Sequence, residues 1–172
     1  MKKVIIILLA TVLLFPIKSF GLKKIPGKYE LIGDVKKAFG KDRVTIVEFF
    51  NFSCGHCYNF LPHSKNLERK YGNKIIYVKI PIFWGRQTEF PAIAFYLAKS
   101  RGIADEVTKN IFDANFKGGA QIFDPRVVNF IISESGISED VRNQKNLITK
   151  VKQGMALASK YKANETPTII LN

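Results

Sequence analysis

Residues 44–60 have the sequence VTIVEFFNFSCGHCYNF, and the rest of the architecture can be built outward from them. Val44–Phe50 is rich in β-branched and aromatic residues, a composition that predicts a strand. A helix is predicted over 54–71, ended by the glycine that follows. The two cysteines of the chain, Cys54 and Cys57, therefore lie where a strand gives way to the N-terminus of a helix.

Strand and helix patterns continue on both sides of this segment. A second strand is predicted at 74–80, so that two strands flank the first helix as a β-α-β unit. Apolar periodicity predicts four further helices, at 88–102, 104–116, 124–136 and 138–161, the first capped by Thr88 and the last opened by Ser138. A strand KYELI and a helical turn DVKKAFG are predicted before the segment, and a strand TIILN ends the sequence. This order predicts an α/β fold with a helical insertion. Pro62 is expected to kink the first helix.

The position of the cysteines at a helix start predicts redox chemistry. The thiolate is the reactive form of cysteine, and the free N–H groups and dipole of a helix N-terminus stabilise negative charge. Cys54, at the helix start, is therefore the predicted exposed and reactive sulfur. Cys57 lies one turn further in and is the predicted buried, resolving sulfur. His56 adds a hydrogen-bond donor or partial positive charge that favours the Cys54 thiolate.

Other interpretations of the cysteine pair are weaker. A structural zinc site needs four ligands, and only His56 and His63 could add to the two thiolates. His63 is expected to be a surface residue. Covalent haem attachment needs a histidine directly after the second cysteine, where this chain has Tyr58. A purely structural disulfide would close a loop too short to add much stability. No metal or other cofactor is therefore predicted.

Glu48 is the second candidate site residue. Two-residue alternation along its strand places it on the same face as Ile46 and Phe50, where a lone carboxylate is unfavourable without a role or a partner. It precedes Cys54 by six residues and could accept and return the proton of Cys57, with a raised pKa. The alternative is a glutamate at an exposed edge or in a salt bridge.

The class of protein is limited by the chain length, the net charge and the N-terminal residues. The chain has 172 residues and a formal net charge of +13. Residues 1–21 are predicted to be a cleavable signal peptide, with a lysine pair before a twelve-residue apolar stretch and small residues near the cut. An uncleaved anchor is the alternative. A secretory signal indicates an oxidising compartment, where a disulfide persists. No nucleic-acid motif accompanies the basic charge, so a solvated basic surface is favoured and no nucleic-acid partner is predicted.

Thr166 and Pro167 precede the final strand and form the third candidate feature. A proline directly before a short apolar strand is unusual unless its peptide bond is special. A cis bond there would expose the Thr166 backbone for pairing with an extended peptide. From the sequence alone a cis bond is the minority outcome, about 5–6% of X-Pro bonds in folded proteins.

These segments together resemble the thioredoxin superfamily, and specifically the bacterial DsbA-type thiol:disulfide oxidoreductases. The matching segments are VEFFNFSCGHCYNF, the PIFWG stretch, the helical insertion and ETPTIILN. The resemblance implies a thioredoxin-like fold in two parts, 22–82 and 151–172, separated by a helical insertion at 83–150. It implies that Glu48 is the family's buried acid and Pro167 its cis-proline. Phe83 and Trp84 then lie near an apolar substrate groove, or are ordinary packing residues.

The resemblance also implies a function. The protein would be a periplasmic monomer that donates the Cys54–Cys57 disulfide to unfolded or newly exported cysteine-containing proteins. A membrane reoxidant of the DsbB type would restore the disulfide. Alternatives are a disulfide isomerase or reductase with the same site, or a non-catalytic peptide-binding module.

Three positions differ from the usual pattern of the family. Gly-His between the cysteines, Pro62 and Thr166 are more typical of isomerase or thioredoxin relatives, so that the choice between oxidase and isomerase stays open. The family continues with a strand and a helix after the position of Asn172, and both are missing here. We therefore expect a chain that ends at Asn172 to fold poorly, because apolar surface and a strand edge would be uncovered.

Overall fold

The computed structural model describes residues 29–30, 32 and 43–171. The chain divides into two units, Met1–Leu31 and Ile32–Asn172, and only Tyr29 and Glu30 of the first are described. The predicted signal peptide at 1–21 and the predicted turn DVKKAFG lie outside the described residues. The described part of the predicted strand KYELI is not in a strand. All further description concerns the second unit.

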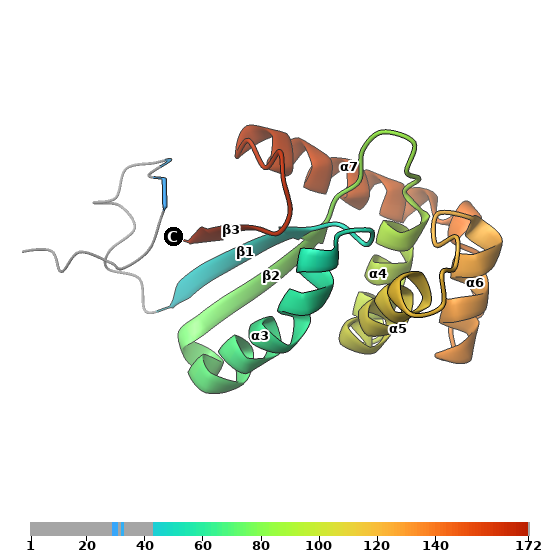
Figure 1. The fold of residues 1–172 in the computed structure, drawn as a ribbon, viewed down its shortest axis with the longest axis horizontal. Coiled ribbons are helices and arrows are strands. Elements are labelled where there is room, and N and C mark those ends of the chain that lie inside the picture. The colour runs from blue at the N-terminus through green and yellow to red at the C-terminus, as the bar shows by residue number, and fades with distance from the viewer. Residues whose placement is uncertain (1–28, 31, 33–42, 172) are drawn as a thin grey trace, which may run out of the picture. The chain divides into compact units, whose positions relative to one another are not determined.

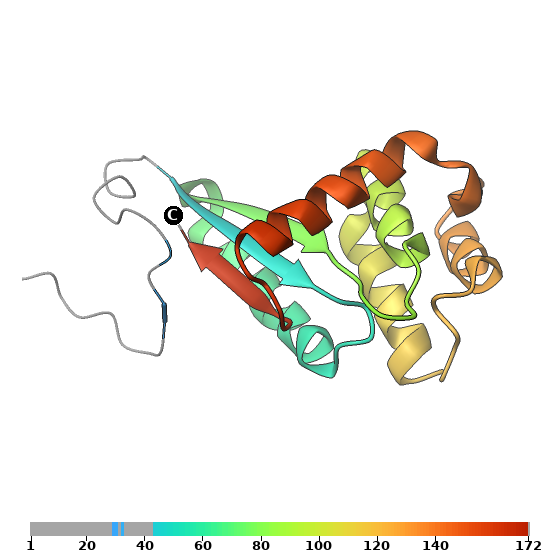
Figure 2. The ribbon, with the colours of Figure 1, turned by 90° about the horizontal axis from the view of Figure 1, so that it is seen from above.

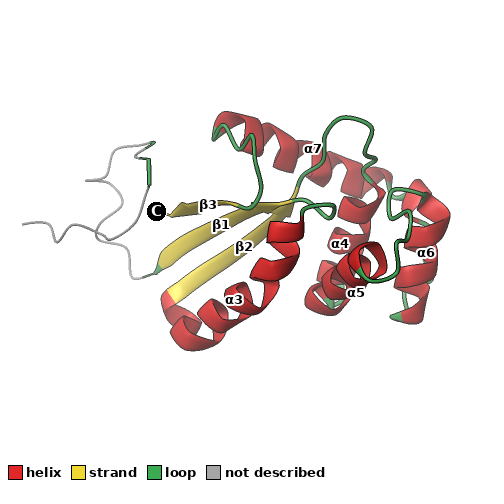
Figure 3. Ribbon diagram, in the orientation of Figure 1, coloured by secondary structure: helices red, strands yellow, loops and turns green. Residues whose placement is uncertain are grey.

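This unit contains a three-stranded mixed sheet (Figures 1 and 3). Strand β1 (Val44–Phe50) lies in the middle, with β2 (Ile75–Pro81) on one side and β3 (Thr168–Leu171) on the other. β1 and β2 are parallel, with Glu48 opposite Lys79, and β1 and β3 are antiparallel. The first two strands are thus confirmed within one residue of their predicted ends.

Helix α3 (Gly55–Tyr71) joins the two parallel strands and begins at the cysteine motif. Cys54 is its N-cap residue, as the sequence predicts. Gly72 ends the helix with a positive φ of 49°, a conformation that glycine adopts without steric cost. A 3₁₀ turn, η2 (Gly72–Lys74), then leads into β2. The helix continues through Pro62.

Four longer helices follow β2 before the chain returns to the sheet. They are α4 (Phe90–Ser100), α5 (Ala104–Phe116), α6 (Pro125–Glu134) and α7 (Lys145–Lys160), with a 3₁₀ turn, η3 (Val141–Asn143), before the last. The predicted start of α6 is confirmed, because the Asp124 side chain accepts a hydrogen bond from the N–H of Arg126. The predicted limits of α5 are also confirmed.

Two predicted helix starts are wrong. Thr88 does not cap α4, because its hydroxyl donates to the carbonyl oxygen of Phe123, 2.7 Å away. Ser138 does not open the last helix either. Asp140 caps the short turn η3 instead, accepting from the N–H of Arg142, and α7 begins only at Lys145. In both cases a hydrogen bond specific to this fold takes the place of the predicted helix start.

The sheet is covered on both faces, by α3 on one and by α7 on the other (Figure 2). On the α7 face a small core forms from Phe49, Ile80, Ile82, Ala158 and Ala163. Helix and sheet approach closely here. A Cβ atom on Gly154 would lie 2.8 Å from Cγ2 of Ile80, so the contact requires a residue without a side chain.

A second, larger core lies among α3, α4, α5, α6, η3, α7 and the loop after β1. Aromatic rings run through it in contact: Phe50 packs edge-on against Phe52 and Phe95, and Phe112 stacks with Tyr58. The limits of the helical insertion, residues 83–150, stay a prediction. Helix α7 continues past the second limit.

Candidate redox site

Cys54 lies just beyond the carboxyl end of the central strand, where its sulfur meets a free N–H group of α3. The Cys57 N–H donates to Cys54 Sγ, with 3.3 Å between nitrogen and sulfur. The Cys54 N–H in turn donates to the carbonyl oxygen of Asn51 at 3.0 Å, which fixes the loop before the helix. The side chain of Cys54 is partly exposed and thus accessible to another thiol.

Cys57 lies one helical turn further in and is 1% exposed. Both cysteines are free thiols in this structure. The predicted difference in exposure between the two sulfurs is therefore present in the reduced state of the protein.

The surroundings of the two thiols shift their pKa values in opposite directions. Burial opposes ionisation of Cys54, but hydrogen bonds with the Thr166 side chain, with Cys57 and with the His56 N–H lower the pKa of its thiol overall. Burial raises the pKa of Cys57 to about 12, against a weaker opposite effect of the Asn51 N–H. As the pH rises, the partly exposed Cys54 is thus the first of the two thiols to ionise.

Thr166 and Pro167 lie directly beside Cys54. The peptide bond between them is cis. The Cys54 thiol donates to the Thr166 carbonyl oxygen, with 3.1 Å between sulfur and oxygen. The register of the sheet explains why Thr166 lies beside Cys54. Thr168 lies opposite Phe49, so the residues before Thr168 extend past the end of β1.

Glu48 is 2% exposed. Side chains alternate along β1 and the neighbouring Phe49 packs in the core on the α7 side, so Glu48 faces the other side of the sheet, which α3 covers. The hydroxyl of Tyr77 donates to Glu48 Oε2 at 2.9 Å, and Lys79, opposite Glu48 on β2, adds a nearby positive charge. Burial is the largest effect on this carboxyl, and its pKa is raised although Tyr77 and Lys79 act against the rise. Among the described residues no hydrogen bond joins Glu48 to Cys57.

The remaining predicted site residues differ in exposure. His56 and His63 are both exposed, and no side-chain hydrogen bond of His56 is present in the described part of the chain. Phe83 is half-buried against the larger core, and its N–H donates to the sulfur of Met155 at 3.5 Å. Trp84 is 43% exposed. Of the two, Trp84 is the one with a ring available to a partner.

Sequence reasoning missed Asn51 as a site residue. It is 2% exposed, and its amide nitrogen donates to the Ile82 carbonyl oxygen at 3.0 Å and to Gln87 Oε1 at 2.6 Å. Its Oδ1 atom accepts from both the N–H and the hydroxyl of Ser53, each at 2.7 Å. The Gln87 amide also donates to the Ser53 hydroxyl, and the Trp84 N–H donates to Gln87 Oε1. This Asn51–Gln87 network joins the loop before Cys54 to the loop that carries Trp84.

A second missed contact joins α3 to α5. The Tyr58 hydroxyl donates to Asp113 Oδ1 at 2.6 Å, and its ring stacks on Phe116 with 5.2 Å between centroids. Hydrogen bonds from Lys109 and Tyr58 lower the pKa of Asp113 to about 2. The only sequence signal for Tyr58 is its position beside Cys57.

The described residues contain no group of three or more His, Cys, Asp or Glu side chains that could hold a metal ion. Within the same part of the chain, no helix combines the length and apolarity needed to cross a bilayer.

A sheet of this order, with a Cys-x-x-Cys pair at the start of the helix after its central strand and a cis-proline beside it, defines a protein of the thioredoxin-fold class. Within that class, the DSBA-like thioredoxin domain family matches residues 45–172, and the chain belongs to this family. The resemblance and the thioredoxin-like fold inferred from the sequence are thereby confirmed.

Relatives and solved structures agree with this assignment. The thiol:disulfide interchange protein DsbA of Burkholderia cepacia is 26% identical over 133 residues, and that of Pseudomonas syringae pv. tomato is 25% identical over 134. These matches cover 75% and 76% of this chain, and the chain spans 63% of the length of each relative.

Similar solved structures include Pseudomonas aeruginosa DsbA, with a TM-score of 0.68 at 22% identity, over 78% of this chain and 72% of that one. The oxidoreductase DsbA from Xylella fastidiosa has a TM-score of 0.67 at 23% identity, over 76% and 74% of the two chains. At these identities the likeness supports the fold.

Proposed function

We propose that the protein is a thiol:disulfide oxidoreductase that donates a Cys54–Cys57 disulfide to other proteins. The observation that carries the proposal is the opposite pKa shift of two sulfurs one helical turn apart. Cys54 is accessible and has a lowered pKa, whereas burial raises the pKa of Cys57 to about 12. Such a pair can react at one sulfur while the other is kept from solvent.

The reaction starts from the disulfide form. A substrate thiolate attacks Cys54 Sγ, a bond forms between the two sulfurs, and the Cys54–Cys57 bond breaks. Cys57 leaves with the bonding electron pair and takes up a proton, because its pKa lies far above neutral. A second substrate thiolate then attacks the substrate sulfur of the mixed disulfide. Cys54 leaves as a thiolate, which its lowered pKa favours. The substrate loses two electrons, and the cysteine pair gains them.

Glu48 is the proposed proton partner of Cys57 in this cycle. Its raised pKa allows it to hold a proton nearer to neutral pH than an exposed glutamate does. Because no hydrogen bond joins the two side chains, a proton moves between them through an intervening group such as water. Pro167 and the Thr166 backbone would hold an extended substrate beside Cys54, and Trp84 would offer it an apolar contact.

The proposed substrates are unfolded or newly exported proteins with cysteines, and the proposed location is the periplasm. The names of the relatives, thiol:disulfide interchange proteins, support the class of substrate. A membrane reoxidant of the DsbB type would take the two electrons from the reduced pair. We propose that the protein acts as a monomer.

A disulfide isomerase or reductase is the second candidate function. Gly55 and His56 between the cysteines, and Thr166 before the cis-proline, favour it. The two functions differ in redox potential, because a lower Cys54 pKa stabilises the reduced form and makes the disulfide more oxidising.

Equilibration of the protein in glutathione buffers, with oxidation of a dithiol peptide followed in parallel, tests the proposal. An oxidase gives a reduced form more stable than the disulfide form and fast peptide oxidation. A potential near that of thioredoxin, about −270 mV, would contradict it. Cys54→Ser is expected to abolish peptide oxidation, and Cys57→Ser to accumulate the mixed disulfide with substrate. Asn59→Ala, at an exposed position of α3 near the pair, is the matched control.

A further inference from the structure

The face of the sheet beneath α3 carries a buried group of polar side chains that the cysteine chemistry above leaves unexplained. Residues 77 and 79 of β2 and residues 46 and 48 of β1 point to this face, because side chains alternate along a strand and the register pairs 46 with 77 and 48 with 79. Tyr77, Lys79 and Glu48 are the polar members. Only Glu48 was expected from the sequence.

Tyr77 is the direct hydrogen-bond partner of Glu48. Its hydroxyl oxygen lies 2.9 Å from Glu48 Oε2. Burial, followed by the charge of Glu48, raises the pKa of Tyr77 far above its ordinary value. The hydroxyl therefore keeps its proton at every pH of interest and acts as a fixed donor to the carboxyl.

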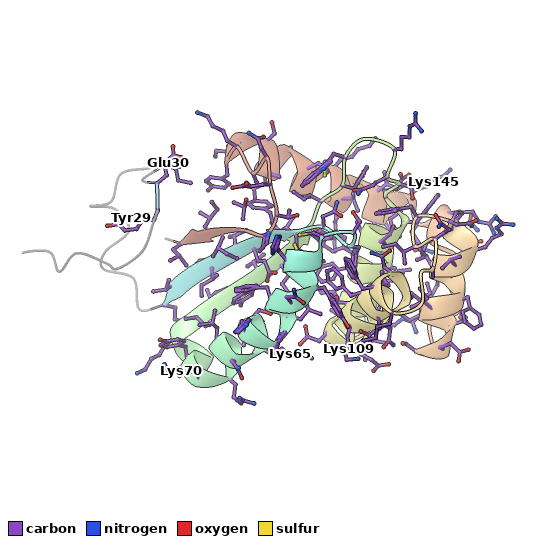
Figure 4. All side chains as sticks on the ribbon, in the orientation of Figure 1. Tyr29, Glu30, Lys65, Lys70, Lys109 and Lys145 are labelled. Carbon is purple, nitrogen blue, oxygen red and sulfur yellow. The ribbon has the colours of Figure 1, made fainter. Side chains whose placement is uncertain are left out.

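Lys79 is held by other partners. It is 9% exposed, and its ammonium group lies 3.0 Å from Asp105 Oδ1 and 3.5 Å from Glu68 Oε1. Lys65, labelled on α3 in Figure 4, also reaches Asp105 at 3.8 Å. Because two carboxylates bind it, Lys79 acts on Glu48 through its charge rather than by a hydrogen bond.

The charged and titratable groups around Glu48 come from β2, α3 and α5. Tyr77 and Lys79 of β2 lower its pKa, whereas Glu68 of α3 and Asp105 of α5 raise it slightly, and burial raises it most. The residue opposite on β3 is Ile169, which does not titrate. Of these groups, Tyr77 alone fixes the orientation of the carboxyl.

We propose that Tyr77 is a positioning residue whose hydroxyl holds the Glu48 carboxyl in the orientation from which it exchanges a proton with the cysteine pair. The effect of Tyr77 on thiol exchange rests on the proposed function. The hydrogen bond between Tyr77 and Glu48 does not depend on that function. Proton exchange requires a carboxyl with a defined lone pair and a defined proton site, and one fixed donor at Oε2 leaves the other oxygen for the proton.

The central experiment is a titration of Glu48 by carbon-13 NMR, with labelled glutamate assigned through Glu48→Gln. Tyr77→Phe removes the hydroxyl and keeps the ring, which lies 5.7 Å from the Lys79 ammonium group. The hydrogen bond favours the carboxylate, so its loss is expected to decrease the acid dissociation constant of Glu48 about tenfold. Tyr96→Phe is the matched control, because Tyr96 is also half-buried with a raised pKa but donates no hydrogen bond in the described residues.

A second readout separates positioning from a structural role. The pH profile of peptide oxidation is measured for Tyr77→Phe in the natural background and with Glu48→Gln. A shift toward higher pH that occurs only when Glu48 is present supports the proposal. An equal shift in both backgrounds, or an unchanged Glu48 titration in Tyr77→Phe, overturns it. If the natural protein oxidises no peptide, the proposed function fails, while the Glu48 titration still decides whether Tyr77 holds the carboxyl.

Incorporation of 3-fluorotyrosine guards against a variant that does not fold. Fluorine makes the phenol a stronger donor without shortening the side chain, so the Glu48 titration is expected to move to lower pH. The Glu139 carboxyl, which accepts a hydrogen bond from Arg101 and not from a tyrosine, is the control in the same spectra, and a shift of equal size there would contradict the role of Tyr77.

Discussion

The sulfur of Cys54 lies 3.1 Å from the carbonyl oxygen of Thr166, although 112 positions separate the two residues in the chain. The antiparallel pairing of β3 with β1 brings them together, since it carries the residues before Thr168 past the end of the central strand. The Cys54 thiol thus lies between its own helix and a backbone segment from the end of the described chain. Its chemistry depends on both.

The two thiols should differ in the pH at which they can be alkylated. The thiolate fraction grows as pH rises through the pKa, so Cys54, with its lowered pKa, is expected to react with iodoacetamide at a pH where free cysteine is still largely protonated. Cys57 is expected to stay unmodified until near pH 12. Mass spectrometry of the reduced protein after short pulses at each pH gives both profiles. Equal profiles would contradict the opposite shifts.

Glu48→Gln is expected to stabilise the reduced protein at neutral pH. Burial raises the folded-state pKa of Glu48 above its ordinary value of 4.5. The natural protein therefore has its full stability below the unfolded pKa and loses stability as pH rises through the folded pKa. Glutamine is neutral at every pH, so the variant does not lose this stability as pH rises. Its side-chain oxygen can still accept the Tyr77 hydrogen bond. The expected gain is present at pH 7 and disappears below the unfolded pKa, as measured by urea unfolding at the two pH values.

Asn51→Ala should destabilise the protein and slow thiol exchange together. Its side chain makes four hydrogen bonds while 2% exposed, and its removal leaves the Ile82 carbonyl and Gln87 without these partners. The expected loss is about 1–3 kcal/mol in the free energy of unfolding. Ser53→Ala is the control. Because Ser53 is exposed, water can replace its bonds, and a loss below about 1 kcal/mol is expected. An equal loss for both variants would argue against the role of Asn51.

Gly154→Ala is expected to destabilise the protein, although alanine is the better helix former by about 1 kcal/mol. The new Cβ would lie 2.8 Å from Cγ2 of Ile80, so α7 or β2 must shift, and overpacking of this kind costs typically about 1–3 kcal/mol. Ser159→Ala, at an exposed position of the same helix, is expected to be neutral or slightly stabilising. Thermal unfolding of both variants tests this prediction. A Tm of Gly154→Ala above that of the natural protein would refute the close approach of Gly154 to Ile80.

The sequence predicted those features whose signals are local. The strand at Val44–Phe50 and the helix at Ala104–Phe116 have composition and periodicity that need no partner to interpret. The Cys-x-x-Cys pattern that predicts redox chemistry lies within four residues of sequence. Thr88 failed as a helix start because its hydroxyl donates to the Phe123 carbonyl oxygen, a contact that has no sequence pattern. Ser138 failed because Asp140, itself a preferred capping residue, caps η3 two positions later.

The supporting residues of the site could not be predicted for the same physical reason. Tyr77 becomes a partner of Glu48 only through the register of two parallel strands, and Gln87 meets Asn51 across 36 positions. Glu48 could be identified because a carboxylate within an apolar run is unusual by itself. A tyrosine in a strand and a glutamine in a loop are ordinary, so only the folded arrangement reveals their contacts.

The Asn51–Gln87 network bears on attempts to transplant this chemistry into another scaffold. A graft of the four residues from Cys54 to Cys57 would carry the sulfurs but leave behind the amide side chains that clamp the loop before them. The transferable unit is larger and discontinuous, and comprises residues 51–57, the 82–87 loop and the Thr166 carbonyl. Engineers who recruit the motif alone should obtain an ordinary dithiol, whereas a recipient that supplies all three pieces should inherit the asymmetry between its sulfurs.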